Sequence, residues 1–281
     1  MSLRYVVCDV FTDRPLTGNQ LAVFTDARNL DDALMQSLAR EMNFAESVFL
    51  LPARAGGHAR LRIFTPRQEV PFAGHPTLGT AFVVGESTQL RDVVLETGVG
   101  LVPVRLEREG PRVMFGWMTQ PVPRLGPCDV EAELLAALGV ARSELPVQSY
   151  DNGIAHVYVT LPSPDAVAAL RPDLTRLGRI WAGGTNVFAG DGERWKTRMF
   201  APASGVPEDA ATGSAAGPLA LHLVRHGRLE LGRTIRIEQG AELQRPSVLH
   251  ARVHGSLDAP SVEVGGSAVV VARGEFRLSR G

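Results

Sequence analysis

Three titratable side chains stand where a general base or a charge-stabilising group is useful. Glu46 opens the apolar run SVFLL, so its carboxylate lies at the entrance of a predicted buried strand. Apolar surroundings disfavour the charged form of a carboxylic acid, and we expect them to raise its pKa toward the range of a general base. His75 and Asp209 stand beside glycine turns, in AGHPTLG and EDAATGS. Together they predict proton transfer, although each also fits a structural role: a solvated strand start, a helix N-cap, and an Asx-turn or cap.

Two glycine turns predict a second kind of chemistry, the binding of an anion. Gly74 precedes His75 and a helix expected to begin at Pro76, while Gly213 and Ser214 precede a helix of small residues. Helix N-termini present free backbone N–H groups, and glycine lets a ligand approach them closely. Neither turn is a phosphate-binding loop, because no GxxxxGK[ST] or GxGxxG occurs in the chain. We expect the two turns to hold a carboxylate.

An internal repeat relates these turns to one another. Residues 62–71, RIFTPRQEVP, align without a gap with residues 198–207, RMFAPASGVP, and five of the ten positions are identical. Each copy leads into a glycine turn and an apolar helix. The copies lie about half a chain apart, which favours duplication over a chance recurrence of strand–turn–helix sequence. We therefore expect two similar halves whose helix starts face one cleft.

The elements that position these residues follow from hydrophobic periodicity, which predicts a mixed α and β protein. A Pro-rich stretch at residues 119–129 is expected to connect the halves. The expected helices cover residues 31–41, with Asp31 or Asn29 at the start, 76–85, 130–138 and 214–227. The expected strands cover residues 5–11, 21–24, 46–51, 61–64, 93–96, 101–106, 112–115, 155–161, 186–189, 197–200, 234–238, 250–253, 262–264 and 268–273.

Composition and charge exclude several classes of function. The 281 residues carry a formal net charge of −1 and no basic stripe, so we expect no nucleic-acid binding and no attraction to a membrane. No apolar stretch is long enough to span a bilayer and no signal peptide precedes the first strand, which predicts a cytoplasmic protein. Cys8 and Cys128 cannot form a disulfide framework. His222 and His226 have metal-ligand spacing but no third ligand nearby, so a helix face is expected there rather than a metal site.

Four segments, in order, resemble one family: DVFTDRPLTGNQLAVF, NFAESVFL, EVPFAGHPTLGTAF and VPEDAATGSAAGPLALHL. They are similar to the phenazine-biosynthesis (PhzF-like) isomerases, relatives of diaminopimelate epimerase and proline racemase. The resemblance implies an α+β, diaminopimelate epimerase-like fold. Such a fold has two pseudo-symmetric halves, each a curled, mostly antiparallel sheet around a central helix, with the site in the cleft between them. We place the halves at residues 1–118 and 125–281, with the C-terminal strand as a candidate to complete the first half.

The resemblance also assigns roles to individual residues. The family's acid/base glutamate falls on Glu46, its GHP histidine on His75 and its aspartate on Asp209, and these are the expected catalytic residues. The expected substrate-binding residues are Asn19, Gly74, Gly213 and Ser214. A homodimer and catalysis without a metal or an organic cofactor are further implications.

These observations predict an isomerase that moves a proton within a small carboxylated, anionic metabolite, with Glu46 as general acid and base. The epimerase branch of the superfamily uses two cysteines, one at each central helix start. The corresponding turns here, AGHP and AATG, contain no thiol, so two-cysteine racemisation is not expected. The alternative is a non-catalytic member of the same fold that binds a small molecule or a protein.

Overall fold

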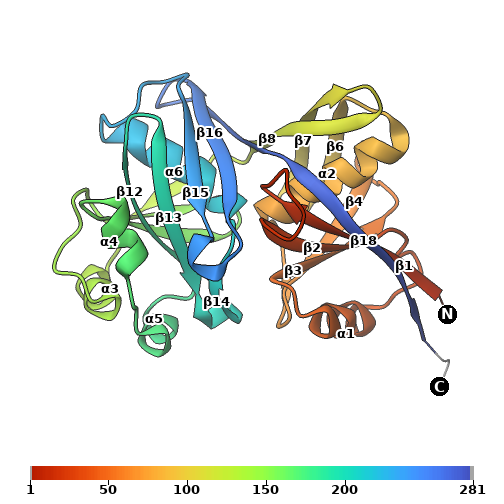
Figure 1. Ribbon diagram of the computed structural model, residues 1–281, viewed down its shortest axis with the longest axis horizontal. Helices are drawn as coiled ribbons and strands as arrows, with labels where there is room; N and C mark the ends of the chain where they lie inside the picture. Colours follow the sequence, from red (N-terminus) through yellow and green to blue (C-terminus); the bar gives the residue numbers. More distant parts are fainter. Residues whose placement is uncertain (1, 279–281) are drawn as a thin grey trace. The chain divides into compact units, whose positions relative to one another are not determined.

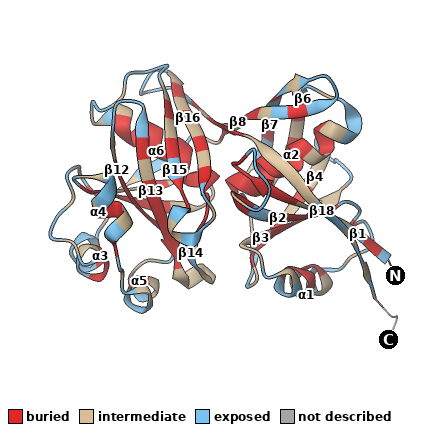
Figure 2. Ribbon diagram, in the orientation of Figure 1, coloured by how far each residue is buried: buried red, intermediate tan, exposed pale blue. Residues whose placement is uncertain are grey.

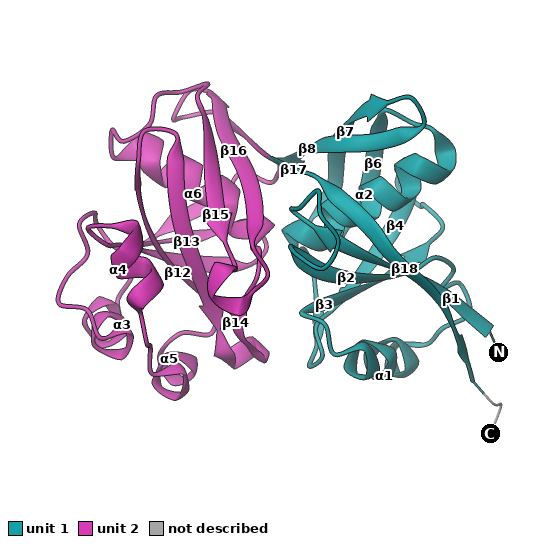
Figure 3. Cartoon of the chain, in the orientation of Figure 1, with its two compact units in different colours: residues 1–119, 265–281 teal, residues 120–264 magenta. Residues whose placement is uncertain are grey.

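The computed structural model describes residues 2–278, which divide into two compact units. The first consists of residues 1–119 and 265–281, and the second of residues 120–264 (Figure 3). The second unit thus ends at Val264 rather than at residue 281, where the second half was expected to end. The reason is that the C-terminal strand β18 (Ala268–Arg277) pairs antiparallel with β1 (Ser2–Val10) and so completes the first unit.

The first unit is a sheet curled around one helix, α2 (Gly74–Thr88) (Figure 1). Its other strands are β2 Asn19–Phe24, β3 Glu46–Leu51, β4 Ala59–Phe64, β5 Glu69–Val70, β6 Asp92–Thr97, β7 Gly100–Glu109 and β8 Arg112–Gln120. β1 lies between β18 and β2, and β2 pairs in parallel with β3. β4 pairs antiparallel with β3 and in parallel with β6, and antiparallel pairs join β6 to β7 and β7 to β8.

Helix α2 is buried from Gly74 to Phe82, as an apolar helix surrounded by strands must be (Figure 2). It begins at Gly74, two residues before the expected start at Pro76, so the proline is the third helical residue. Gly79 permits close packing, because a Cβ atom there would lie 2.7 Å from methyl groups of Val10 and Leu21. The sheet therefore approaches the helix closely near its first turns.

A second helix of this unit, α1 (Asp32–Met42), packs on a core that includes Phe24, Phe49 and Phe64. Asp31 is its N-cap, with Oδ1 accepting a hydrogen bond of 2.8 Å from the backbone N–H of Leu34. The predicted start of this helix is confirmed.

The second unit repeats the same sheet path around α6 (Gly213–Arg225). Its strands are β9 Arg124–Gly126, β10 Gln148–Asp151, β11 Ala155–Thr160, β12 Gly184–Asp191, β13 Arg194–Ala201, β14 Val206–Asp209, β15 Thr234–Gln239, β16 Ser247–Gly255 and β17 Pro260–Gly266. β11 pairs in parallel with β12, β12 antiparallel with β13, β13 in parallel with β15, and β15 antiparallel with β16. The order of parallel and antiparallel pairs matches that from β2 to β7. Three short helices pack on this unit's outer core: α3 Glu131–Leu138, α4 Pro164–Ala169 and α5 Leu174–Ile180.

The arginine that opens each copy of the internal repeat makes the same contacts in both units. Arg62 of β4 forms a two-pronged ion pair with Glu69, and Arg198 of β13 forms one with Glu208. Each guanidinium also lies over the phenylalanine two residues later, at 5.2 Å and 5.1 Å from the ring centroid. Shared pairing and shared contacts support the duplication that the sequence predicted.

The copies differ just before the central helix. Gly74 lies three residues after Pro71, whereas Gly213 lies six residues after Pro207. The longer connection, EDAAT, contains Asp209. The second unit therefore has room for an additional carboxylate at its helix start.

The Pro-rich stretch at residues 119–129 marks the boundary between units but is not only a connection. It contains β9, which pairs antiparallel with β10 through Arg124↔Asp151, Leu125↔Tyr150 and Gly126↔Ser149. Prolines flank this three-residue strand without interrupting its pairing. In the part of the chain that the structure describes, no helix has the length and apolar character needed to cross a membrane.

Candidate active site

In the first unit, the structure brings Glu46 and His75 together. Glu46 is the first residue of β3, opposite Leu21 of β2, and His75 is the second residue of α2. Oε2 of Glu46 lies 3.6 Å from Nδ1 of His75, and the side chains are 15% and 3% exposed. The predicted catalytic groups thus lie side by side, with the imidazole buried and the carboxylate partly exposed.

Asn19 completes this group. It begins β2, and its Nδ2 lies 3.2 Å from Nδ1 of His75. Gly18, immediately before it, has φ +70°, and a Cβ there would lie 2.5 Å from the carbonyl oxygen of Val10. Only glycine fits this turn without strain, and the turn places Asn19 against the imidazole.

Burial controls the charge of His75. Desolvation lowers its pKa to about 3, while a hydrogen bond with the backbone of Gln20 acts in the opposite direction. The imidazole is therefore neutral near pH 7. Its buried Nε2 has no hydrogen-bond partner among residues 2–278. The N-cap of α2 is Ala73, without a side-chain cap, so capping does not explain His75.

Asp209 lies at the end of β14 and is held at the start of α6. Its Oδ2 accepts a hydrogen bond of 2.7 Å from the hydroxyl of Thr212, the N-cap residue. Gln239 secures the same turn, because its side chain accepts from the Thr212 backbone N–H and donates to the Asp209 carbonyl. The aspartate is 6% exposed, so it is fixed rather than free to rotate in solvent.

Gly213 and Ser214 open α6 and are both buried. Their carbonyl oxygens accept hydrogen bonds from Gln120 at 2.8 Å and Asn152 at 2.9 Å. Oγ of Ser214 lies 3.0 Å from Nε2 of His156. Side chains of two strands, β8 and β11, and of the turn after β10 therefore fix the first turn of this helix.

Sequence reasoning missed these supporting side chains. Gln120 stands at the start of the stretch interpreted as a linker, and His156 lies within the apolar strand run AHVYVT. A polar residue in an otherwise apolar strand was the available signal, because buried polar groups need partners.

The pair His222 and His226 belongs to the core of the second unit. His222 is fully buried, its Nδ1 lies 3.1 Å from the hydroxyl of Tyr150, and its ring stacks on Tyr158. His226 binds Gln148 through Nε2 at 2.9 Å. Within residues 2–278, no group of three or more His, Cys, Asp or Glu side chains is arranged to hold a metal ion.

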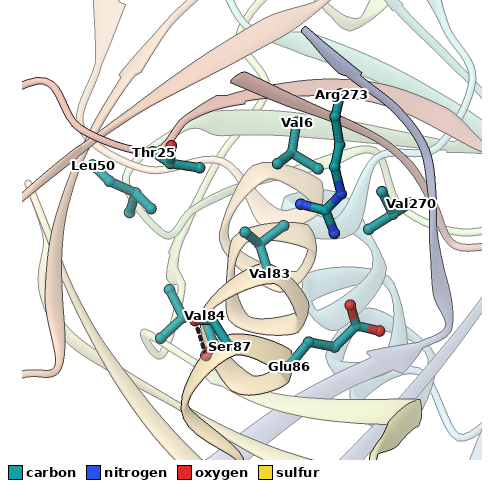
Figure 4. A pocket seen from close by; sticks show the side chains of 9 residues that line it. All are labelled: Val6, Thr25, Leu50, Val83, Val84, Glu86, Ser87, Val270 and Arg273. Carbon is teal, nitrogen blue, oxygen red and sulfur yellow. Dashed lines mark hydrogen bonds between the residues drawn. The ribbon is translucent and has the colours of Figure 1, made fainter. Parts of the chain in front are cut away.

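A separate pocket of about 400 Å³ lies in the first unit, along the C-terminal half of α2 (Figure 4). It is lined by Val6 of β1, Val83 and Glu86 of α2, and Arg273 of β18, among others. It does not include Glu46 or the start of α2, so it is not part of the candidate active site.

Residues 8–274 match the sequence profile of the phenazine biosynthesis-like family, PhzC-PhzF. The chain belongs to this family. It is 50% identical over 275 residues to a trans-2,3-dihydro-3-hydroxyanthranilate isomerase of Pseudomonas fluorescens, covering 98% of this chain and 99% of the relative. The protein of that name from Pseudomonas aeruginosa is 49% identical over 276 residues, with the same coverage. The chain is thus a PhzF-like isomerase, which favours the enzyme over the non-catalytic alternative.

Solved structures confirm the fold. A PhzF-family protein of Bacillus anthracis superposes with a TM-score of 0.86 at 22% identity, covering 99% of this chain and 100% of the other. A predicted epimerase of Pseudomonas aeruginosa gives 0.85 at 35% identity with the same coverage. A hydroxyproline epimerase of Agrobacterium vitis gives 0.69 at 13% identity, covering 98% and 92%. The predicted diaminopimelate epimerase-like class is therefore confirmed.

Proposed function

We propose that this PhzF-like isomerase moves a proton within trans-2,3-dihydro-3-hydroxyanthranilate or a closely related carboxylated ring, without a cofactor. The support is a half-buried carboxylate, Glu46, next to a neutral imidazole, His75, in a chain half identical to enzymes named for that substrate. The substrate's name describes a cyclohexadiene with carboxylate, amino and hydroxyl groups. An isomerase of such a ring conserves every atom, so one C–H bond breaks, another forms and the double bonds move.

Glu46 is the proposed general base and then general acid. As a carboxylate it removes a proton from a ring carbon, and as the resulting carboxylic acid it returns a proton to another carbon on the same face. His75 stays neutral during this exchange, because its pKa of about 3 lies far below neutrality. Its Nε2 atom, which has no hydrogen-bond partner among residues 2–278, is available to the substrate's polar groups. A neutral imidazole beside the carboxylate orients the substrate without competing for the proton.

The second unit supplies the proposed charge-stabilising and binding groups. We assign Asp209 to orienting the substrate's polar group, and Gly213 and Ser214 to holding its carboxylate. Gly74 has the same binding role at the start of α2, with Asn19 as a further binding residue. The rigid hydrogen bonds around Asp209 and Ser214 support these roles, because preorganised groups need not rearrange during the reaction.

Glu46→Gln tests the proposal. Glutamine preserves size and hydrogen bonding but has no transferable proton, so kcat should fall at least ~100-fold while substrate still binds. In deuterated water, wild-type product should carry deuterium at the carbon that receives the proton, less any direct internal return. Turnover and label are measured by mass spectrometry on trans-2,3-dihydro-3-hydroxyanthranilate.

A matched control is Glu41→Gln, an exposed glutamate of α1, which should leave turnover unchanged. Near wild-type turnover by the Glu46→Gln protein would remove Glu46 from the mechanism. The base would then have to be sought at His75 or Asp209.

A further inference from the structure

A chain of three buried side chains leads away from the start of α6. Asn186 of β12 lies behind His156 of β11, and His156 lies behind Ser214. Nδ2 of Asn186 is 3.2 Å from Nδ1 of His156, and Nε2 of His156 is 3.0 Å from Oγ of Ser214. All three residues are at most 3% exposed. The hydrogen-bonded chain thus runs from the Asn186 amide through the His156 imidazole to the Ser214 hydroxyl.

A glycine on the neighbouring strand makes room for the imidazole of His156. Gly184 lies opposite His156 in the parallel β11–β12 pair, and a Cβ there would lie 2.4 Å from Nδ1. A glycine at that point lets the ring lie flat against the neighbouring strand. The ring is therefore fixed in position by backbone geometry as well as by its two hydrogen bonds.

The direction of these hydrogen bonds can be deduced from Asn186. Its Nδ2 also lies 3.4 Å from the carbonyl oxygen of Val157, and a carbonyl only accepts hydrogen bonds. The NH₂ end of the amide must face both groups, so Nδ1 of His156 is an acceptor without a proton. Burial lowers the pKa of His156 to about 4, against the opposite effect of the Asp151 carboxylate. The ring is thus neutral near pH 7, with its one proton on Nε2.

This tautomer sets the direction of the serine hydroxyl. Nε2–H donates to Oγ of Ser214, so the serine's own O–H cannot point at the ring. Ser214 has no other side-chain partner among the described residues. We infer that His156 is a positioning residue which, locked by Asn186, turns the hydroxyl of Ser214 into a dedicated donor toward the substrate's carboxylate. This inference rests on the proposed function, in which Ser214 binds that group.

The tautomer is measured directly by nitrogen-15 NMR of the full chain labelled at histidine, with His156 assigned from a His156→Gln spectrum. We expect a neutral ring near pH 7 that carries its proton on Nε2. A ring protonated on Nδ1, or a cationic ring, would overturn the inference. This measurement does not depend on activity, so it stands apart from the test of Glu46.

Binding of 3-hydroxyanthranilate, a stable aromatic counterpart of the proposed substrate, tests the consequence. Asn186→Asp keeps the shape of the side chain, but its carboxylate accepts a hydrogen bond from Nδ1–H of His156. With the ring proton on Nδ1, Nε2 becomes an acceptor, and the Ser214 hydroxyl turns inward to donate to it. We expect binding to weaken about tenfold or more, as for the loss of one donor to a charged group. His156→Leu leaves the hydroxyl without its positioning partner but offers it no inward acceptor, so it should weaken binding less than Asn186→Asp and more than His156→Gln. His156→Gln, whose amide can still donate to Ser214, should stay within about threefold of wild type.

Circular dichroism and thermal melting identify variants that are folded. A folded Asn186→Asp protein with wild-type affinity would overturn the inference, as would equal losses for His156→Gln and His156→Leu. If Glu46→Gln remains active but Asn186→Asp loses affinity, the proposed mechanism fails while the role of His156 stands. If neither histidine variant folds, the affinity of a folded Asn186→Asp protein decides.

Discussion

At the scale of residues, the proposed chemistry uses the side chain that follows the glycine at each helix start. These residues are His75 and Ser214, and the two thiols lie elsewhere. Burial raises the pKa of Cys8 to about 12 and also raises that of Cys128, so both remain protonated at neutral pH. We expect Cys8→Ala/Cys128→Ser to keep turnover within about twofold and to lose about 1 kcal/mol of unfolding free energy. Steady-state kinetics with urea unfolding checks this, and loss of turnover in the folded variant would contradict proton transfer without thiols.

Residue-level prediction selected side chains that differ in polarity from the residues around them. Glu46 at the edge of an apolar strand and His75 within GHP were both predicted to be catalytic, and the structure places their side chains 3.6 Å apart. His156 was missed because its importance comes from neighbours far away in the sequence. Its bonds to Asn186 and Ser214 exist only once β11, β12 and α6 are assembled. Such partners are set by tertiary packing, which single-sequence patterns do not contain.

At the scale of elements, the turn before β2 connects backbone geometry to the candidate site. Gly18→Ala would place a Cβ 2.5 Å from a backbone oxygen in a turn with φ +70°, so we expect a loss of about 2–4 kcal/mol of unfolding free energy. Turnover should fall as well, because Asn19 moves away from His75. Gly56→Ala is the matched control: its φ is +89°, but nothing lies within 4 Å of the added Cβ. It should lose only about 1 kcal/mol and keep full turnover, as urea titrations and kinetics will show. Equal effects of the two substitutions would remove the turn from this argument.

The prediction found the longer strands but missed four short strands and two short helices of the described residues: β5, β9, β10, β14, α4 and α5. β3 covers Glu46–Leu51, as expected from its apolar run. Pro76 indicated a helix start but stands two residues inside α2, because the preceding Gly74 and His75 also adopt helical geometry. The prolines at residues 121–127 suggested a connection, yet β9 forms between them. Pairing with β10 supplies the hydrogen bonds there, and a local pattern does not reveal that partner.

At the scale of the whole molecule, buried histidines make stability depend on pH. Burial lowers the pKa of His75, His156 and His222 to about 3, 4 and 3, whereas an unfolded histidine titrates near 6.5. Below about pH 6.5 the unfolded chain takes up protons that the folded chain excludes. Unfolding free energy should therefore be flat above pH 7 and fall between about pH 6.5 and 4, by up to about 1.4 kcal/mol per pH unit for each ring. Urea unfolding at several pH values measures this slope. His222→Gln should reduce it by about one ring's share. A midpoint independent of pH from 7.5 to 5 would contradict the burial of these rings.

The return of β18 to β1 has a consequence for how the protein is made. Residues 120–264 are an uninterrupted segment, whereas the first unit needs residues from both ends of the chain. During synthesis, β1 can pair with β2 early, but its other edge has no β18 to bind until the whole second unit and residues 268–277 have been made. The later-encoded unit can reach its native state on the ribosome before the earlier one does. An unpaired strand edge on the nascent chain is a site for wrong association. Stop codons shortly before residue 268 should therefore yield chains whose second unit is folded and whose first unit aggregates.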